Sequence, residues 1–227
     1  MRIKRIFLVV FFGILSAVLL AAETVSAAPI TINGLTFTEV SANVQITSGS
    51  GTGSVADPIV LHENVSGLDV TMSIEGLIGF GNLTQSGHAA GFALQKVVTN
   101  LTSAAWNFYD HELQETLGVP SGEGDGLSFA QGCASCRPFT SNMFTIVDEI
   151  IDVRDYVNFS GGIVNPGETV TFNIMITDNT PLDIFYLRQR PDFEPGVKVP
   201  EPGSLLLLGS GLGGLWLRGR KRFKANS

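Results

Sequence analysis

Apolar and polar side chains alternate in two stretches of the chain, Leu68–Glu75 and Thr169–Thr177. Because successive side chains of a β-strand point to opposite faces, this pattern predicts strands with one buried and one solvated face. The apolar sets are Leu68, Val70, Met72 and Ile74 in the first stretch, and Val170, Phe172, Ile174 and Ile176 in the second. We expect both sets to face one core, although they lie far apart in the sequence.

Shorter β-like runs lie before, between and after these two stretches, and Gly, Pro and Asn residues separate them. No run shows the 3.6-residue periodicity of an amphipathic helix of normal length. The pattern predicts an all-β domain, an antiparallel β-sandwich of the jelly-roll or immunoglobulin-like type. The additional predicted strands are Leu35–Val40, Gly91–Asn100, Ala105–Glu112, Leu127–Ala130, Met143–Val147, Val153–Phe159 and Asp183–Gln189.

The N-terminus has the three parts of a secretory signal peptide. A basic region (Arg2, Lys4 and Arg5) precedes the apolar run Ile6–Leu20, and the small residues Val25-Ser26-Ala27 offer a cleavage site. Residues 1–27 are therefore predicted to be a signal peptide read by the export machinery, the alternative being an uncleaved membrane anchor.

The C-terminus combines a proline-rich linker, an apolar segment and a basic cluster. Val199, Pro200, Glu201 and Pro202 are followed by Gly203, by the apolar residues 204–217 and by a basic tail, 218–227. A helix over Gly203–Leu217 would span roughly 22 Å, which is short for a bilayer core of about 30 Å. We therefore expect a short hydrophobic helix and transient membrane anchoring, and an ordinary C-terminal anchor is the alternative. The basic cluster, expected to stay cytoplasmic, is Arg218, Arg220, Lys221 and Arg222.

This order of Pro-Glu-Pro, apolar run and basic cluster resembles the PEP-CTERM sorting signal of exported bacterial proteins. The resemblance implies that an exosortase, a membrane protease, recognises the region around Pro200-Glu201-Pro202 as its substrate. It also implies delivery to the cell surface or extracellular matrix after transient anchoring in the inner membrane. The predicted organisation is a signal peptide (1–27), a β-sandwich domain (28–195) and a sorting segment (196–227).

Charge is distributed unevenly along the chain. Between Ala28 and Lys198 there are 6 Lys and Arg residues against 19 Asp and Glu residues, which gives a net charge near −13. Such a surface disfavours nucleic acids and anionic membranes as partners and attracts divalent cations.

The two cysteines form the motif Cys133-Ala134-Ser135-Cys136. Arg137 stands where a haem-attachment motif has His, and a zinc site would need two further ligands. In an exported protein a short structural disulfide between Cys133 and Cys136 is the expected state. A redox or metal-binding role is the alternative.

No set of residues predicts a catalytic site, a cofactor or a metal centre. His111 lies between Asp110 and Glu112, but on a strand the two carboxylates would share one face and the imidazole the other, so we expect a solvated strand end. A polar turn is expected at Glu123 and Asp125, the alternative being a calcium site without EF-hand spacing.

The aromatic residues of the run Ala105–Glu112 have two interpretations. Trp106 and Phe108 would share one strand face, and core packing is their expected role. The alternative is a ligand platform, in which exposed rings of Trp106 and Tyr109 stack on a sugar.

These features predict an exported, non-enzymatic protein with a structural or adhesive role associated with exopolysaccharide. One alternative is a carbohydrate-binding module, assisted by calcium or not, which an exposed aromatic strip would favour. The other is a hydrolase acting on matrix polysaccharide, which paired carboxylates in a cleft at glycosidase spacing would favour.

Overall fold

Strands dominate the computed structural model, which describes residues 28–122, 124–130, 139–150 and 155–192. All described residues belong to one compact unit. The helix α2, Leu77–Phe80, is a single turn that connects two strands. The prediction of an all-β fold is confirmed.

A seven-stranded sheet contains two of the four strands that carry the polar groups of the core. Every pair of neighbours in this sheet is antiparallel. Each central strand has a partner on both sides, and β7 lies between β13 and β11. In spatial order the strands are β1 (Ile30–Ile32), β2 (Leu35–Glu39), β5 (Val70–Glu75), β13 (Ile184–Pro191), β7 (Trp106–Gln114), β11 (Tyr156–Val164) and β10 (Ile146–Ile150).

The second sheet differs from the prediction in one respect, because its β4 and β6 strands are parallel. The chain leaves this sheet after β4, forms β5 in the other sheet and returns through α2 to β6. Two reversals of direction between β4 and β6 leave them parallel. The spatial order is β3 (Val44–Ser50), β4 (Ile59–Val65), β6 (Ala90–Asn100), β12 (Thr169–Asp178) and β8 (Leu127–Ser128), and β9 (Thr140–Ser141) also pairs with β12.

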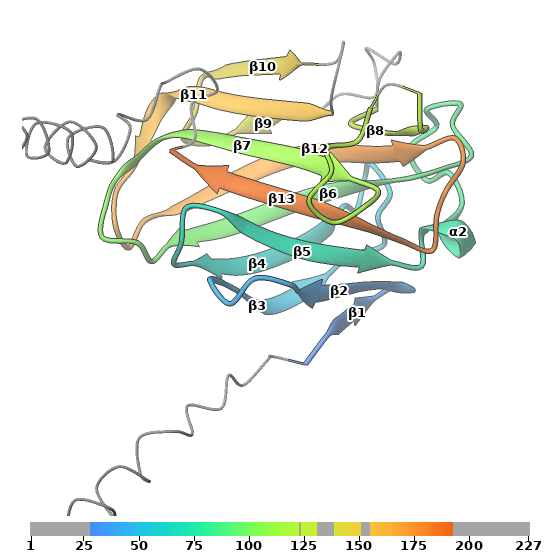
Figure 1. Ribbon diagram of the computed structural model, residues 1–227, viewed down its shortest axis with the longest axis horizontal. Coiled ribbons are helices and arrows are strands. Elements are labelled where there is room, and N and C mark those ends of the chain that lie inside the picture. Colours follow the sequence, from blue (N-terminus) through green and yellow to red (C-terminus); the bar gives the residue numbers. More distant parts are fainter. Residues whose placement is uncertain (1–27, 123, 131–138, 151–154, 193–227) are drawn as a thin grey trace, which may run out of the picture. The chain divides into compact units, whose positions relative to one another are not determined.

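The core lies between the two sheets. Figure 1 shows β5, β13 and β7 in front of β4, β6 and β12, and buried apolar side chains of both sheets pack together between them. The apolar set of β12, predicted from its alternation, is fully buried there, as are Val70, Met72 and Ile74 of β5. The prediction that two distant alternating stretches share one core is confirmed, and the sandwich architecture follows from it.

The strand predicted from the alternation at Leu68–Glu75 was wrong in two details. Leu68 precedes β5 and is 54% exposed, so it is not part of the buried set. Thr71 and Ser73, expected on a solvated face, are buried. The reason is their position in a central strand, where Arg188 and Tyr186 of β13 stand opposite them and cover them.

Four strands, β1, β3, β4 and β9, were not predicted. The end of β3 runs into a glycine-rich turn in which Gly51 has φ +103°, and a Cβ atom there would lie 2.0 Å from the Pro58 carbonyl oxygen. Only glycine fits such a close approach between chain segments. The Thr52 and Gly53 N–H groups donate to the Asp57 carbonyl and close the turn that leads into β4.

In the described part of the chain, no helix is long and apolar enough to cross a membrane. The predicted signal peptide (1–27), the apolar segment (204–217) and the end of the predicted domain at residue 195 lie outside the described residues. These limits stay predictions.

Candidate functional site

Five polar side chains occupy inward-facing positions between the two sheets. Each is at most 1% exposed and lies on the buried face of its strand, where apolar residues are usual. They come from four strands and both sheets, and they are Glu63 (β4), Lys96 (β6), Tyr109 and His111 (β7) and Gln189 (β13). We call these residues the interior polar cluster.

Direct contacts link four members of the interior polar cluster across the core. Lys96 Nζ lies 3.3 Å from Glu63 Oε2. The Gln189 Nε2 group donates a hydrogen bond of 2.8 Å to the same oxygen. Tyr109 donates its hydroxyl hydrogen to Gln189 Oε1 at 2.6 Å. One carboxylate oxygen of Glu63 therefore contacts both an amine and an amide nitrogen, and the amide oxygen is hydrogen-bonded separately.

Aromatic rings surround this chain of contacts. The Tyr109 ring lies 4.6 Å from that of Phe172 and 4.9 Å from the His111 imidazole, measured between centroids. His111 also packs against Phe159 and Phe172, and neither of its ring nitrogens has a hydrogen-bond partner among the described residues. The interior polar cluster is thus closed off from bulk solvent and has few protein groups to compensate its charge.

Burial changes the protonation of the interior polar cluster. Desolvation lowers the pKa of Lys96 to about 8, although the charge of Glu63 acts in the opposite direction. Burial also raises the pKa of Tyr109 well above its ordinary value and lowers the pKa of His111 well below it. At neutral pH the tyrosine therefore remains a hydrogen-bond donor and the imidazole is uncharged. Lys96 is mostly protonated, with a minor fraction present as the neutral amine.

A second group of charges lies on the outer face of the seven-stranded sheet. Arg190 donates to Asp110 Oδ2 at 2.7 Å through Nε and to Glu112 Oε2 at 2.8 Å through Nη2. Arg188 contacts Asp69 and lies 3.6 Å from Glu112. Burial raises the pKa of Asp110 to about 7, while Arg190 opposes this shift. We call Asp69, Asp110, Glu112, Arg188 and Arg190 the outer charge cluster.

The expectation of a solvated strand end at His111 was wrong. Asp110 and Glu112 do share one face and His111 the other, but all three are buried. The run belongs to β7, a central strand that is covered on one face by the six-stranded sheet and flanked by Arg190 and Tyr156 on the other. The two carboxylates are held by arginines and do not join the imidazole in one site.

The residues of the predicted aromatic platform are also buried. The Trp106 and Tyr109 rings pack edge to face at 5.5 Å and are not exposed. Trp106 donates to the Thr102 hydroxyl and Tyr109 to Gln189. Neither ring offers an outer face for a sugar, and their packing agrees with the core interpretation.

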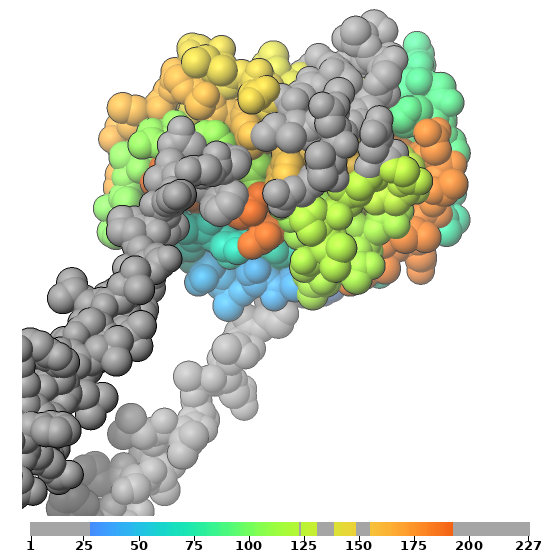
Figure 2. All heavy atoms as spheres, turned by 45° about the horizontal axis from the view of Figure 1, so that its top comes forward, coloured from blue at the N-terminus to red at the C-terminus, as the bar shows by residue number. Residues whose placement is uncertain are grey.

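The carboxylate of Asp125 is used within its own turn. It accepts hydrogen bonds from the Ser121 hydroxyl (2.6 Å) and from the Gly122 and Leu127 N–H groups (2.9 and 3.2 Å). The surrounding segment lies on the surface, coloured lime in Figure 2. Glu123, the other candidate calcium ligand, is outside the described residues. Within the residues that are described, no three His, Cys, Asp or Glu side chains are placed to hold a metal ion.

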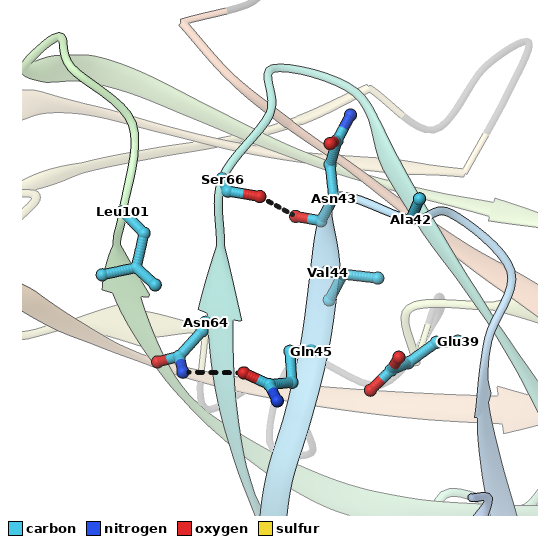
Figure 3. Close-up of a pocket in the computed structure, with 8 residues that line it drawn as sticks. All are labelled: Glu39, Ala42, Asn43, Val44, Gln45, Asn64, Ser66 and Leu101. Atoms are coloured by element: carbon cyan, nitrogen blue, oxygen red, sulfur yellow. Dashed lines mark hydrogen bonds between the residues drawn. The ribbon is translucent and has the colours of Figure 1, made fainter. Parts of the chain in front are cut away.

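A polar pocket of about 260 Å³ opens on the surface beside β3 and β4. Figure 3 shows the amides of Gln45 and Asn64 meeting across the two strands, with Glu39 on the far side of Gln45. The Glu39 Oε1 atom accepts a hydrogen bond of 2.6 Å from the Ile46 N–H. The complete lining is Glu39, Ala42, Asn43, Val44, Gln45, Asn64, Ser66 and Leu101.

Sequence reasoning missed Glu63, Lys96 and Gln189. A signal for them was present, because each interrupts an otherwise apolar inward set: Leu61 and Val65 flank Glu63, Leu94 and Val98 flank Lys96, and Leu187 precedes Gln189 on the same face. A polar residue at such a position is costly to bury and therefore indicates a partner across the core.

The cysteines and the sorting segment cannot be placed in the same way. Cys133 and Cys136, the tripeptide Pro200-Glu201-Pro202 and the basic cluster that follows the apolar run all lie outside the described residues. The disulfide stays a prediction.

Comparison with curated proteins gives no match. A family model for the PEP-CTERM protein-sorting motif matches residues 198–222. This range contains the Pro-Glu-Pro tripeptide, the apolar run and the basic cluster through Arg222. The chain therefore carries a PEP-CTERM protein-sorting motif, which indicates an exported protein that is sorted by an exosortase.

Proposed function

We propose that this protein is a non-enzymatic component of the cell surface or extracellular matrix, with a structural or adhesive role in association with exopolysaccharide. The observation that carries the proposal is the sorting motif at residues 198–222, because it sends the β-sandwich to a compartment where matrix polymers are assembled. Contact with exopolysaccharide would use the polar pocket beside β3 and β4.

Two features of the domain support a structural role. The two outward-facing carboxylates of β7, Asp110 and Glu112, are buried and held by Arg190. They are therefore not available as an acid and a base facing a substrate. The polar pocket carries one carboxylate, from Glu39, and this group is hydrogen-bonded to the backbone. Glycosidases of the usual type need two carboxylates on either side of the bond they cleave.

Replacing Pro200, Glu201 and Pro202 together by Ala is expected to leave full-length protein in the membrane fraction of a host that contains an exosortase. The protease loses its recognition sequence, whereas the apolar run still holds the chain in the bilayer. Fractionation followed by immunoblotting measures the effect.

The segment Glu194-Pro195 offers a matched control, because it has the same residue types a few positions upstream. Changing Glu194 and Pro195 to Ala should leave sorting unaffected. Equal membrane retention of both variants would mean that the tripeptide is not the recognised element.

A carbohydrate-binding role is a second candidate, and the polar pocket favours it. Its amide and hydroxyl groups, from Asn43, Gln45, Asn64 and Ser66, are of the kind that hydrogen-bond to sugar hydroxyls. The pocket is open to the surface, unlike the Trp106 and Tyr109 rings.

The variant Gln45→Ala with Asn64→Ala is expected to lose most binding to exopolysaccharide in a sedimentation assay, because two opposed amides of the pocket disappear. Asn107→Ala is the control, since this exposed residue lies in β7, outside the pocket lining. Undiminished binding by the double variant, with the fold intact by circular dichroism, would exclude the pocket as the binding site.

A further inference from the structure

The interior polar cluster brings together the parts of an amide-forming reaction. Lys96 supplies a primary amine and Gln189 a carboxamide, and both contact one oxygen of Glu63, at 3.3 Å and 2.8 Å. The carboxamide oxygen accepts a hydrogen bond from the Tyr109 hydroxyl at 2.6 Å. Lys96 Nζ has no hydrogen-bond partner of good geometry among the described residues, so its lone pair is not committed elsewhere when the amine is neutral.

We propose that Lys96 and Gln189 form an intramolecular isopeptide bond, with Glu63 carrying the proton and Tyr109 stabilising the developing charge on the amide oxygen. The bond would join β6 of the six-stranded sheet to β13 of the seven-stranded sheet. It is independent of the sorting motif and of the proposed role in the matrix.

The reaction balances without an oxidant, a metal or a second substrate. Neutral Lys96 Nζ attacks Cδ of Gln189 and forms a tetrahedral intermediate, whose oxygen is Gln189 Oε1. Glu63 accepts a proton from Nζ and delivers it to Nε2, which it already contacts. The Cδ–Nε2 bond then breaks, ammonia leaves, and Nζ–Cδ becomes a secondary amide. The Glu63 carboxylate is regenerated.

The surroundings favour each step. Burial among aromatic rings keeps water, the competing nucleophile, away from Gln189, and it lowers the pKa of Lys96 to about 8, which populates the neutral amine. Burial also keeps Tyr109 protonated, so that its hydroxyl is a fixed donor to the oxygen on which negative charge develops. The four groups are held by strands rather than loops, which limits their movement.

The cross-link would change how the domain unfolds. It connects positions 96 and 189, so the unfolded chain retains a long closed loop and loses conformational entropy. Unlike a disulfide, this bond resists reduction. A covalent tie between the two sheets suits a protein that works outside the cell, where it is not refolded after damage.

The experiment is high-resolution mass spectrometry of the full chain, expressed in bacteria, purified in detergent and unfolded under reducing conditions. Peptide mapping defines the termini from which the unlinked mass is calculated. The expected result is a mass lower by one ammonia, about 17 Da, together with a branched peptide that joins Lys96 to Gln189.

Four variants assign the roles. Lys96→Arg and Gln189→Ala should each show the calculated mass, because one of the reacting groups is missing. Glu63→Gln keeps the size of the side chain but cannot transfer the proton, so it should remain unlinked. Tyr109→Phe should link more slowly when the mass is followed after refolding.

The wild-type mass alone can overturn the proposal, whether or not every variant folds. A folded wild-type protein with the full calculated mass and separate Lys96 and Gln189 peptides would show that the cluster is an ordinary buried ion pair. Loss of one water with a branched Lys96–Glu63 peptide would show that Glu63, and not Gln189, is the electrophile. Either result contradicts the assignment made above.

Discussion

Phe172→Ala is expected to lower the free energy of unfolding by about 3–5 kcal/mol, the usual cost of removing a large buried aromatic side chain. Phe172 is fully buried in β12, and its ring contacts Tyr109, His111, Phe144 and Phe159. The substitution would therefore leave a cavity beside the interior polar cluster, lined by rings of β7 and β11 and by Phe144. Denaturant unfolding of wild type and variant measures the loss.

Thr171→Ala provides the matched control for this prediction. Thr171 is the neighbour of Phe172 in β12 but points to the opposite, partly exposed face. Its backbone N–H, which donates to Asn142 Oδ1, is retained in the variant. Its cost should be well under that of Phe172→Ala, and equal losses would mean that both faces of β12 are buried or that the register is wrong.

Arg190→Met is expected to cost a similar amount, about 3–5 kcal/mol, because it breaks a buried ion pair and leaves charges uncompensated. Asp110 loses both of its contacts with the guanidinium, and Glu112 keeps Arg188 and the Gln114 amide as partners. The apolar part of the methionine side chain preserves much of the packing, so the loss reflects the charges. Arg188→Met should cost less, since Arg188 is 27% exposed and its partner Asp69 is 53% exposed.

The cost of Arg190→Met should also depend on pH. Burial already raises the pKa of Asp110 to about 7 in the folded protein, above its ordinary value of 3.8. Between these two values the folded state binds a proton that the unfolded state has released, so stability contributed by this group falls as pH rises. Removing Arg190 raises the folded pKa further. The variant should therefore be closest to wild type near pH 5 and weakest near pH 8, and an effect that is equal at both pH values would mean that Asp110 stays ionised.

The fold class was predictable from the sequence because burial in a sandwich imposes a period of two on each strand. The apolar set of β12 and most of that of β5 gave this pattern directly. The prediction failed where the pattern continues beyond the strand, as at Leu68, and where polar residues interrupt it, as in β4 with the consecutive residues His62, Glu63 and Asn64.

The order of strands was less predictable than their existence. Alternation tells which side chains are buried but not which strands are neighbours. The parallel pairing of β4 with β6 depends on the excursion through β5 and α2, and nothing in either strand's own sequence specifies it. Such non-local pairing is set by the packing of the whole domain.

The candidate sites also differed in how far the sequence could predict them. The sorting motif was readable because its order along the chain is itself the signal. The interior polar cluster depends on contacts between residues far apart in the sequence, such as Glu63 with Gln189, and no local pattern can pair them. The buried positions of Trp106 and Tyr109 likewise depend on the place of β7 in the middle of its sheet.

The proposed role requires that the chain is exported and sorted through its C-terminal segment. The most direct test is the intact mass of the mature protein recovered from the surface or matrix of a host with an exosortase. The account predicts a chain that begins near Ala28 and lacks the basic tail. Mature protein that still contains Arg218–Ser227 would contradict it.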